Sequence, residues 1–309
     1  MTVLAVDVGG TTIKGAVVDD AGRIRHSLTA PSSADDDPVG AVRALCARLH
    51  TLSAAGETRA AQAIGVVTPG IVDEDEGVVK YAANLRFRDV PLRALIAADL
   101  GLPVAVGHDV RAAGIAEAMA GGLDDFLLLP LGTGIAAAVV VGGVPLAGAT
   151  RAAGEVGHMP VYPGGERCSC GQRGCLEVYA SAGGLARRYA RRGGTPGADS
   201  RTIAATIGTD PVARQVWDDA TAALGTALAT LTLTLDPARI VLGGGLADAG
   251  DLFLDPVRQH LGAALVWREP PPVGRSVFGA RAALIGAAVM ARRAAGLPAP
   301  SGWAADTED

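Results

Sequence analysis

Three of the four cysteines in this chain lie within a short segment, and a histidine precedes them. The cysteines are Cys168, Cys170 and Cys175, and the histidine is His158. Zinc prefers thiolate and imidazole ligands, and four protein ligands leave no open position for a reacting water. The segment therefore predicts a closed, structural zinc site. A disulfide with one spare thiol is the alternative that the spacing leaves open.

A glycine-rich turn follows the first apolar strand, which we expect at residues 3–6. The turn holds Gly9, Gly10, Thr11, Thr12 and Lys14. Glycines let the backbone approach an anion closely, hydroxyls and free amides donate hydrogen bonds to it, and a lysine adds positive charge. Asp7, at the end of the strand, is a candidate ligand for a hydrated magnesium ion. The residues favour a phosphate-binding hairpin, and a plain β-hairpin is the alternative.

Two further glycine turns follow apolar strands later in the chain. They are Thr133-Gly134 after the strand expected at 126–129, and Gly243-Gly244-Gly245 after the strand expected at 239–242. None of the three turns has the spacing of a Walker-type loop. Three strand-to-glycine turns in one chain predict a nucleotide held between two related α/β halves.

A single aspartate, Asp109, follows an apolar strand expected at 104–107 and precedes a helix expected from about Arg111 to Ala120. Phosphoryl transfer to a hydroxyl needs a carboxylate to take the proton, and strand ends are where α/β folds open into binding clefts. Asp109 is therefore a candidate general base. The same position also permits an aspartate that only caps the helix.

These motifs resemble those of the kinase branch of the ROK family, whose name joins repressors, open reading frames and kinases. The segment 7–11 is similar to the family's first phosphate motif, 131–134 to the second and 243–245 to the adenosine motif. Residues 155–158 and 168–177 are similar to its zinc signature at every ligand position, and the resemblance covers nearly the whole chain.

The resemblance implies an α/β, actin-like or hexokinase-like ATPase fold, built as duplicated ribonuclease H-like lobes with a cleft between them. It also implies transfer of phosphate from ATP, with Mg²⁺, to a sugar hydroxyl, with Asp109 as the general base and Zn²⁺ as a structural ion. The residues expected to bind the sugar are Gly70, Asn84, His108, Asp109, Glu155, His158 and Glu177. His158 could bind zinc through one ring nitrogen and a hydroxyl through the other. Surface glutamates on a metal loop are the alternative for Glu155 and Glu177.

The pair His108-Asp109 departs from the resemblance, because the family usually carries Asn-Asp there. Val110 and Arg111 follow, where small and amide residues are common. A histidine changes the shape and the hydrogen bonds offered to the ring hydroxyls. The resemblance implies phosphorylation of the 6-hydroxyl of glucose or a glucose-like hexose, and the histidine opens the alternative of a modified glucose such as the amino sugar kanosamine. His108 could also simply keep one hydrogen bond to a glucose hydroxyl.

At 309 residues the chain is long enough for two lobes. We expect a smaller lobe at 1–109, a larger lobe with the zinc loop at 110–297 and a disordered tail at 298–309. An apolar helix is expected at 220–235, and a last helix at about 280–294 is expected to pack back on the first lobe. Small residues on both helices favour a homodimer or a dimer of dimers.

The net charge of −5 disfavours a nucleic-acid partner, and no apolar run suggests a membrane partner. We expect a cytoplasmic enzyme, with Cys46 buried on a helix and Arg187, Arg188, Arg191 and Arg192 on a solvated helix face. A regulator of the same family would carry a helix-turn-helix module ahead of the first hairpin, and we expect none. An actin-fold ATPase without sugar chemistry would lack the paired glutamates. Polyphosphate in place of ATP remains open as the donor.

Overall fold

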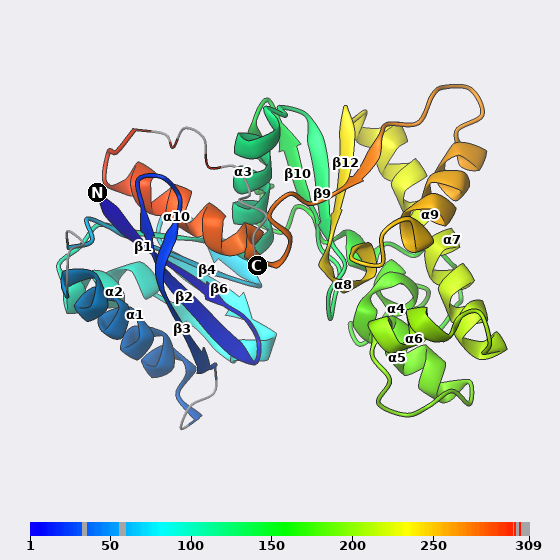
Figure 1. Cartoon of the computed structure of the whole chain (residues 1–309), viewed down its shortest axis with the longest axis horizontal. Coiled ribbons are helices and arrows are strands. Elements are labelled where there is room, and N and C mark those ends of the chain that lie inside the picture. Colours follow the sequence, from blue (N-terminus) through cyan, green and yellow to red (C-terminus); the bar gives the residue numbers. More distant parts are fainter. Residues whose placement is uncertain (33–35, 56–59, 299, 301–302, 304–309) are drawn as a thin grey trace. The chain divides into compact units, whose positions relative to one another are not determined.

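The computed structural model describes residues 1–32, 36–55, 60–298, 300 and 303, and the chain forms two compact units (Figure 1). Unit 1 comprises Met1–Asp124, Gly143–Ala153 and Ala280–Asp309, and unit 2 comprises Asp125–Gly142 and Gly154–Gly279. The sequence placed the first boundary at Asp109. The units divide later because the helix that begins at Asp109 packs on the last helix of the chain, which belongs to unit 1.

Unit 1 contains most of the first half of the chain and its last helix. Its strands are β1 (Thr2–Val8), β2 (Thr12–Asp19), β3 (Ile24–Pro31), β4 (Ile64–Thr68), β5 (Ile71–Asp73), β6 (Val78–Ala82), β7 (Phe87–Val90), β8 (Val104–His108) and β11 (Val144–Pro145). Its helices are α1 (Pro38–Ala54), the 3₁₀ turn η2 (Ala83–Leu85), α2 (Leu92–Leu100), α3 (Asp109–Gly121) and α10 (Ala282–Ala294). The 3₁₀ turn η4 (Gly279–Arg281) lies at the border of the units.

The main sheet of unit 1 has the strand order β3-β2-β1-β4-β8 among the described residues. Strands β1, β4 and β8 are parallel, so their carboxyl ends meet at one edge, where Asp7 and His108 lie. Helices α1 and α2 cover one face, and α3 and α10 lie on the other (Figure 1). Gly65 lets α10 pack closely on β4. A Cβ at this position would lie only 1.9 Å from the carbonyl oxygen of Ala287.

A smaller sheet, in the order β5-β6-β7, extends from the end of β4. Its strands are antiparallel, and η2 joins β6 to β7. This sheet places the turn after β5 against the end of β8, since β5 and β8 are in contact. It therefore brings residues near position 74 to the edge that carries Asp109.

Unit 2 contains the second sheet and most of the remaining helices. Its strands are β9 (Phe126–Pro130), β10 (Ala138–Val141), β12 (Arg239–Gly243) and β13 (Val273–Arg275). Its helices are the 3₁₀ turn η3 (Val156–His158), α4 (Leu176–Ala180), α5 (Ala182–Arg191), α6 (Ser200–Thr206), α7 (Pro211–Leu235), α8 (Gly244–Ala247) and α9 (Asp251–Ala264).

The sheet of unit 2 runs in the order β10-β9-β12-β13. Strand β10 is antiparallel to β9, whereas β9, β12 and β13 are parallel. In unit 1, β2 is likewise antiparallel to β1, which is parallel to β4 and β8. Both units thus combine a hairpin with two further parallel strands, as a duplicated α/β fold requires.

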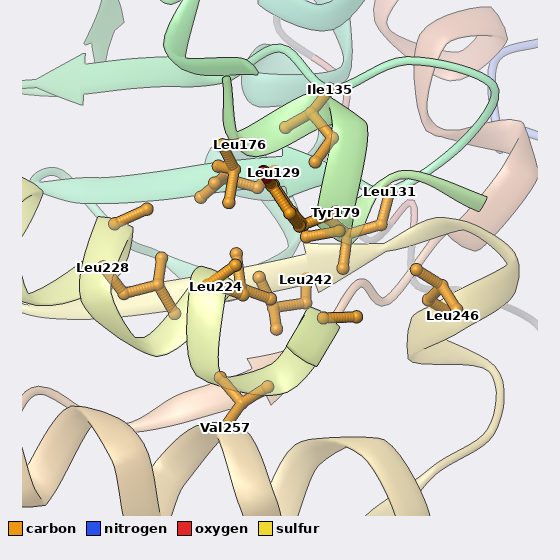
Figure 2. Packing of buried hydrophobic residues seen from close by; sticks show 14 of the residues in the cluster. Leu129, Leu131, Ile135, Leu176, Tyr179, Leu224, Leu228, Leu242, Leu246 and Val257 are labelled. Carbon is orange, nitrogen blue, oxygen red and sulfur yellow. The ribbon is translucent and has the colours of Figure 1, made fainter. Parts of the chain in front are cut away.

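The core of unit 2 lies between the sheet and the helices packed on it (Figure 2). Leu129 and Leu242 come from neighbouring strands, and Leu224 and Leu228 come from α7. All four side chains are buried. The long α7 starts where the Asp210 carboxylate accepts the amide hydrogens of Val212 and Ala213.

The small residues of α10 serve contacts within unit 1. A Cβ on Gly286 would lie 1.9 Å from the carbonyl oxygen of Ala112, so Gly286 allows α10 and α3 to touch. Helix α7 is largely buried in the core of unit 2. These internal contacts account for the small residues, so the helices give no separate argument for a dimer.

The tail expected at 298–309 falls mainly on 299, 301–302 and 304–309, which lie outside the described residues. At Trp303 the structure differs from that expectation. Trp303 is buried, packs over Gly22, and donates from its indole nitrogen to the carbonyl oxygen of Asp20 at 3.0 Å. Within the described part of the chain, no helix has the length and apolar character needed to span a membrane.

Candidate active site and metal centre

The junction of β8 and α3 holds the candidate base, Asp109. Asp109 is the first residue of α3, and the residue that caps the helix is His108. The amide hydrogen of Val110 is shared between His108 Nδ1, at 3.2 Å, and Asp109 Oδ1, at 2.7 Å. His108 occupies the cap position, and the amide of Val110 contacts Oδ1 of Asp109. The Oδ2 oxygen of Asp109 is therefore not needed to cap the helix.

An ion pair that the sequence analysis missed supports this junction. Glu74 Oε1 accepts the backbone amide of His108 at 3.2 Å and Arg111 Nε at 2.9 Å. The guanidinium of Arg111 is buried and also reaches the carbonyl oxygens of Val72 and Arg151. Glu74 stands in an acidic turn, 73–76, and nothing in a single sequence links that turn to an arginine far along the chain.

The electrostatics of the junction keep its histidine neutral. The pKa of His108 is lowered to about 4, mainly by burial and then by the charge of Arg111, while Glu74 opposes the shift. Burial raises the pKa of Asp109 to about 6, against the amide of Val110 and the charge of Arg111. At neutral pH Asp109 is therefore ionised, and its pKa is close to the value that suits a general base.

Asp7 lies at the same edge of the sheet as Asp109. The pKa of Asp7 is raised to about 6, mainly by burial and then by the charge of Asp109, while Lys14 opposes the shift. Lys14 pairs with Asp7 across the β1–β2 hairpin. The negative charge of Asp109 makes ionisation of Asp7 less favourable, and a cation near Asp7 would relieve this cost, so the donor set fits a hydrated magnesium ion.

The first glycine turn also lies beside Asn84. A Cβ on Gly10 would lie 3.2 Å from Asn84 Cβ, and both residues are exposed. Thr11 is exposed and Thr12 is half-buried. Within the turn, the amide of Gly9 donates to the carbonyl oxygen of Thr12. Unit 1 thus brings together the expected hairpin, Asn84, His108 and Asp109.

Gly70 serves a backbone approach in this unit. Its φ of +101° is unfavourable for residues with a side chain, and a Cβ there would lie 2.2 Å from the carbonyl oxygen of Tyr81. The glycine thereby lets the end of β4 pass the β6 strand, which carries the chain toward Asn84. Its observed partner is the protein backbone.

The second and third glycine turns adjoin each other in unit 2. Pro130 of β9 pairs with Gly243 of β12, and the amide of Leu131 donates to the carbonyl oxygen of Gly243 at 2.8 Å. Gly244 has a φ of +81°, and a Cβ there would lie 2.6 Å from the carbonyl oxygen of Leu131. Only glycine allows this approach. The structure therefore places Thr133, Gly134 and the 243–245 turn at one edge of the sheet.

Glu177 links the second turn to the cysteine segment. Its Oε2 accepts the amide of Ile135 at 3.2 Å, and a Cβ on Gly134 would lie 2.6 Å from that oxygen. The residue follows Cys175 by two positions and lies in the first turn of α4. Glu155 lies elsewhere on the same loop system, where its Oε2 is 3.9 Å from His158 Nε2.

The expected metal ligands converge in the structure. One ligand atom from each of His158, Cys168, Cys170 and Cys175 lies within 4.8 Å of the others. The sulfurs of Cys170 and Cys175 are 3.7 Å apart, and Cys168 Sγ is 3.9 Å from His158 Nδ1. Ligands about 2.3 Å from a tetrahedral zinc would be about 3.8 Å from each other. All four cysteines of the chain are free thiols, so the cluster fits a metal and not a disulfide.

The cysteine segment is anchored by a buried arginine, which corrects the expectation of a solvated arginine face on α5. Arg188 is 1% exposed. Its guanidinium donates to Glu166 Oε1 at 2.8 Å and to Asp219 Oδ2 at 2.5 Å, and it lies over the Tyr179 ring. The helical spacing of four arginines did not reveal that one of them faces inward toward two carboxylates.

Comparison with known proteins gives the family. The sequence model of the ROK family matches residues 3–294, and the chain belongs to the ROK family. Glucokinase of Halalkalibacterium halodurans is 35% identical over 281 residues, which cover 84% of this chain and 85% of that protein. N-acetylmannosamine kinase of Shigella flexneri is 32% identical over 302 residues, which cover 94% and 99%.

Among solved structures, a ROK family glucokinase from Streptomyces griseus in complex with glucose and AMPPNP is 32% identical, with a TM-score of 0.80. The match covers 95% of this chain and 100% of that one. Together with the paired mixed sheets, this likeness confirms the expected hexokinase-like α/β fold.

Proposed function

We propose that this chain is an ATP-dependent kinase that phosphorylates the 6-hydroxyl of glucose or a glucose-like hexose. The observation that carries the proposal is the ionised carboxylate of Asp109, placed at the same sheet edge as Asp7 in a chain of the ROK family. The relatives named above are sugar kinases, and one of their structures holds glucose with an ATP analogue. A base beside a magnesium and phosphate site is what hydroxyl phosphorylation requires.

In the proposed reaction, Asp109 takes the proton of the sugar hydroxyl while the hydroxyl oxygen bonds to the terminal phosphorus of ATP. The bond from that phosphorus to the bridging oxygen breaks, and ADP leaves with the electron pair. Asp7 would hold the magnesium ion, which would neutralise charge on the phosphates when bound. Proton removal comes late in such a transfer, so a base with a pKa of about 6 is strong enough.

In unit 1, the proposed phosphate contacts are Gly9, Gly10, Thr11, Thr12 and Lys14. In unit 2, the proposed phosphate contacts are Thr133 and Gly134, and the proposed adenosine contacts are Gly243, Gly244 and Gly245. In support, the turns of unit 2 lie side by side and both follow parallel strands. Backbone amides at such strand ends bind anions well.

In unit 1, the proposed sugar contacts are Asn84 and His108. In unit 2, the proposed sugar contacts are Glu155, His158 and Glu177. Gly70 supports this set through the backbone. In support, His158 turns Nδ1 toward Cys168 and Nε2 toward Glu155, so that one ring could serve both the metal and the sugar loop. The proposed ion is zinc, held by His158 and the three thiols. It would cross-link the loop that ends at Glu177, and Glu177 would in turn steady the second phosphate turn.

An amino derivative of glucose, such as kanosamine, is the second candidate substrate. The observation that favours it is His108, which stands next to the base where the resemblance predicts an asparagine. A homodimer and a cytoplasmic location belong to the same proposal by analogy with sugar kinases.

A steady-state kinetic panel tests the function. Purified protein is assayed with ATP or polyphosphate as donor, and with glucose, mannose, N-acetylmannosamine and kanosamine as acceptors. The proposal expects ATP-dependent turnover of at least one hexose, with products phosphorylated at the primary hydroxyl. A folded, metal-containing protein that binds a sugar but transfers phosphate from neither donor would instead point to a regulator of the family.

A further inference from the structure

The imidazole of His108 has only one nitrogen engaged by the protein. Nδ1 accepts the amide hydrogen of Val110 at 3.2 Å. Among the described residues, Nε2 has no hydrogen-bond partner and is not one of the buried, unpaired side-chain atoms. A nitrogen that accepts an N–H carries no proton itself, so in a neutral ring the proton lies on Nε2.

The Glu74–Arg111 pair fixes the backbone position of His108. Glu74 Oε1 accepts both the backbone amide of His108 and Arg111 Nε, so it fixes the end of β8 relative to α3. Arg111 puts a buried positive charge beside the ring. Protonation of His108 would place a second positive charge on the ring beside Arg111, and the two charges would repel each other.

We infer that His108 is a fixed hydrogen-bond donor to the sugar, presenting Nε2–H, and that it selects a substrate whose facing ring substituent is an uncharged acceptor. This inference rests on the proposed kinase function and deepens it. A hydroxyl or an unprotonated amine can accept from Nε2–H, whereas an ammonium group has no lone pair to offer. If an amino sugar is the substrate, its free-base form is the one bound.

The groups that face the junction agree with a donor role. They are Asp109 and Arg111 of α3, Glu74 of the β5–β6 turn, Asp7 of β1, and Arg151, whose carbonyl oxygen accepts from Arg111. Asp109 Oδ1 is 3.3 Å from His108 Nδ1, and the amide hydrogen of Val110 is directed at both atoms. Burial lowers the pKa of His108 to about 4, with Arg111 adding to the shift, and so favours the neutral ring throughout the range in which Asp109 is ionised.

Nitrogen NMR of the full chain tests the tautomer without any enzymatic turnover. Histidines are labelled with ¹⁵N, and the His108 signals are assigned by their loss in His108→Asn. We expect Nδ1 unprotonated and Nε2 protonated between about pH 5 and pH 8. A proton on Nδ1, or a ring that titrates near its ordinary pKa of about 6.5, would overturn the inference even if the protein is a sugar kinase.

A kinetic test uses glucose analogues in which one ring hydroxyl at a time is replaced by an amine. At the position facing His108, kcat/KM relative to glucose should rise by about tenfold per pH unit until the amine is deprotonated. In His108→Asn the rise should flatten, because the amide oxygen of asparagine accepts from an ammonium. A ratio that falls with pH, or one that rises equally in wild type and His108→Asn, contradicts the inference. Absence of phosphorylation of every sugar would instead refute the proposed function.

Arg111 and Glu74 are positioning residues in this scheme, and their variants should move the His108 pKa in opposite directions. Arg111→Met removes a nearby positive charge and should raise that pKa, whereas Glu74→Gln removes a negative charge and should lower it. Arg43→Met is the matched control, because Arg43 pairs with Asp99 on the exposed surface of the same unit. Unchanged His108 signals in both variants would remove the pair from the scheme. Arg111→Lys should restore part of the wild-type behaviour if charge is what matters.

Discussion

The β8–α3 junction of unit 1 and the cysteine cluster of unit 2 place reactive groups by different means. At the junction, Asp109 and His108 are held by one shared amide and by the Glu74–Arg111 pair. In the cluster, three sulfurs and one imidazole nitrogen face one another across distances that suit a metal. The junction therefore depends on electrostatic balance, whereas the cluster would depend on the proposed zinc ion.

The two regions should respond to different challenges. A charge change at the junction alters the pKa of its groups and the rate of the reaction, with little effect on the rest of unit 1. Loss of the metal removes the link that joins four separate chain positions, and so affects the loop and its stability together.

The largest expected effect is at the junction. Asp109→Asn should lower turnover by about 10² to 10⁴, because the amide cannot take the hydroxyl proton. Sugar and ATP binding, measured by calorimetry, should persist. Asp99→Asn, on the exposed surface of α2, is the control and should keep wild-type turnover. Near wild-type turnover in Asp109→Asn would show that another group is the base.

The second effect concerns the cluster. Protein purified without chelator should contain about one zinc per chain, and Cys170→Ser should lose it and melt at a lower temperature. Cys46→Ala is the control, because Cys46 is buried in unit 1 and is no part of the cluster. Full zinc occupancy in Cys170→Ser would remove Cys170 from the ligand set.

The third effect is the pH dependence of the junction. The active form of Asp109 is ionised, and its pKa is raised to about 6 mainly by burial. The rate should therefore be maximal above about pH 6 and fall about tenfold per pH unit below it. Arg111 lowers this pKa, so Arg111→Met should shift the acid limb of kcat/KM to higher pH. A limb that stays in place in Arg111→Met would show that the titrating group lies elsewhere.

The smallest effect tests the backbone that supports the junction. Gly70→Ala should destabilise the protein by about 2 to 4 kcal/mol, since its φ is positive and a Cβ would meet a carbonyl oxygen. Gly101→Ala is the matched comparison, with a positive φ but open space around it, and should cost about 1 kcal/mol. Equal losses of stability in denaturant would show that the close approach at Gly70 is unimportant.

The sequence predicted the cluster better than the junction. Few residue types bind zinc, and zinc ligands often lie close together in the chain. The type and spacing of Cys168, Cys170 and Cys175 therefore predict a metal site. The glycine turns were located for the same reason, because only glycine permits the approach seen at Gly244. The register that places Pro130 beside Gly243 then brings two of these turns together.

The support of both regions could not be predicted in the same way. Glu74 and Arg111 meet only through the contact of β5 with β8, and Glu166 meets Arg188 through the path of the cysteine loop. A single sequence shows such residues as ordinary surface charges. The burial of Arg111 and Arg188 follows from tertiary packing, which also decided that His108, and not Asp109, caps α3.

The most direct test of the central claim is product identification after incubation with glucose, ATP and magnesium. Phosphorus–proton correlation NMR shows which sugar carbon carries the new phosphoester. The account predicts a coupling to the two C6 protons in the wild-type reaction, one ADP formed per phosphoester, and no such signal with Asp109→Asn over the same time. A phosphoester at another carbon, or an equal yield from Asp109→Asn, would contradict the assignment of this chain as a hexose 6-kinase with Asp109 as its base.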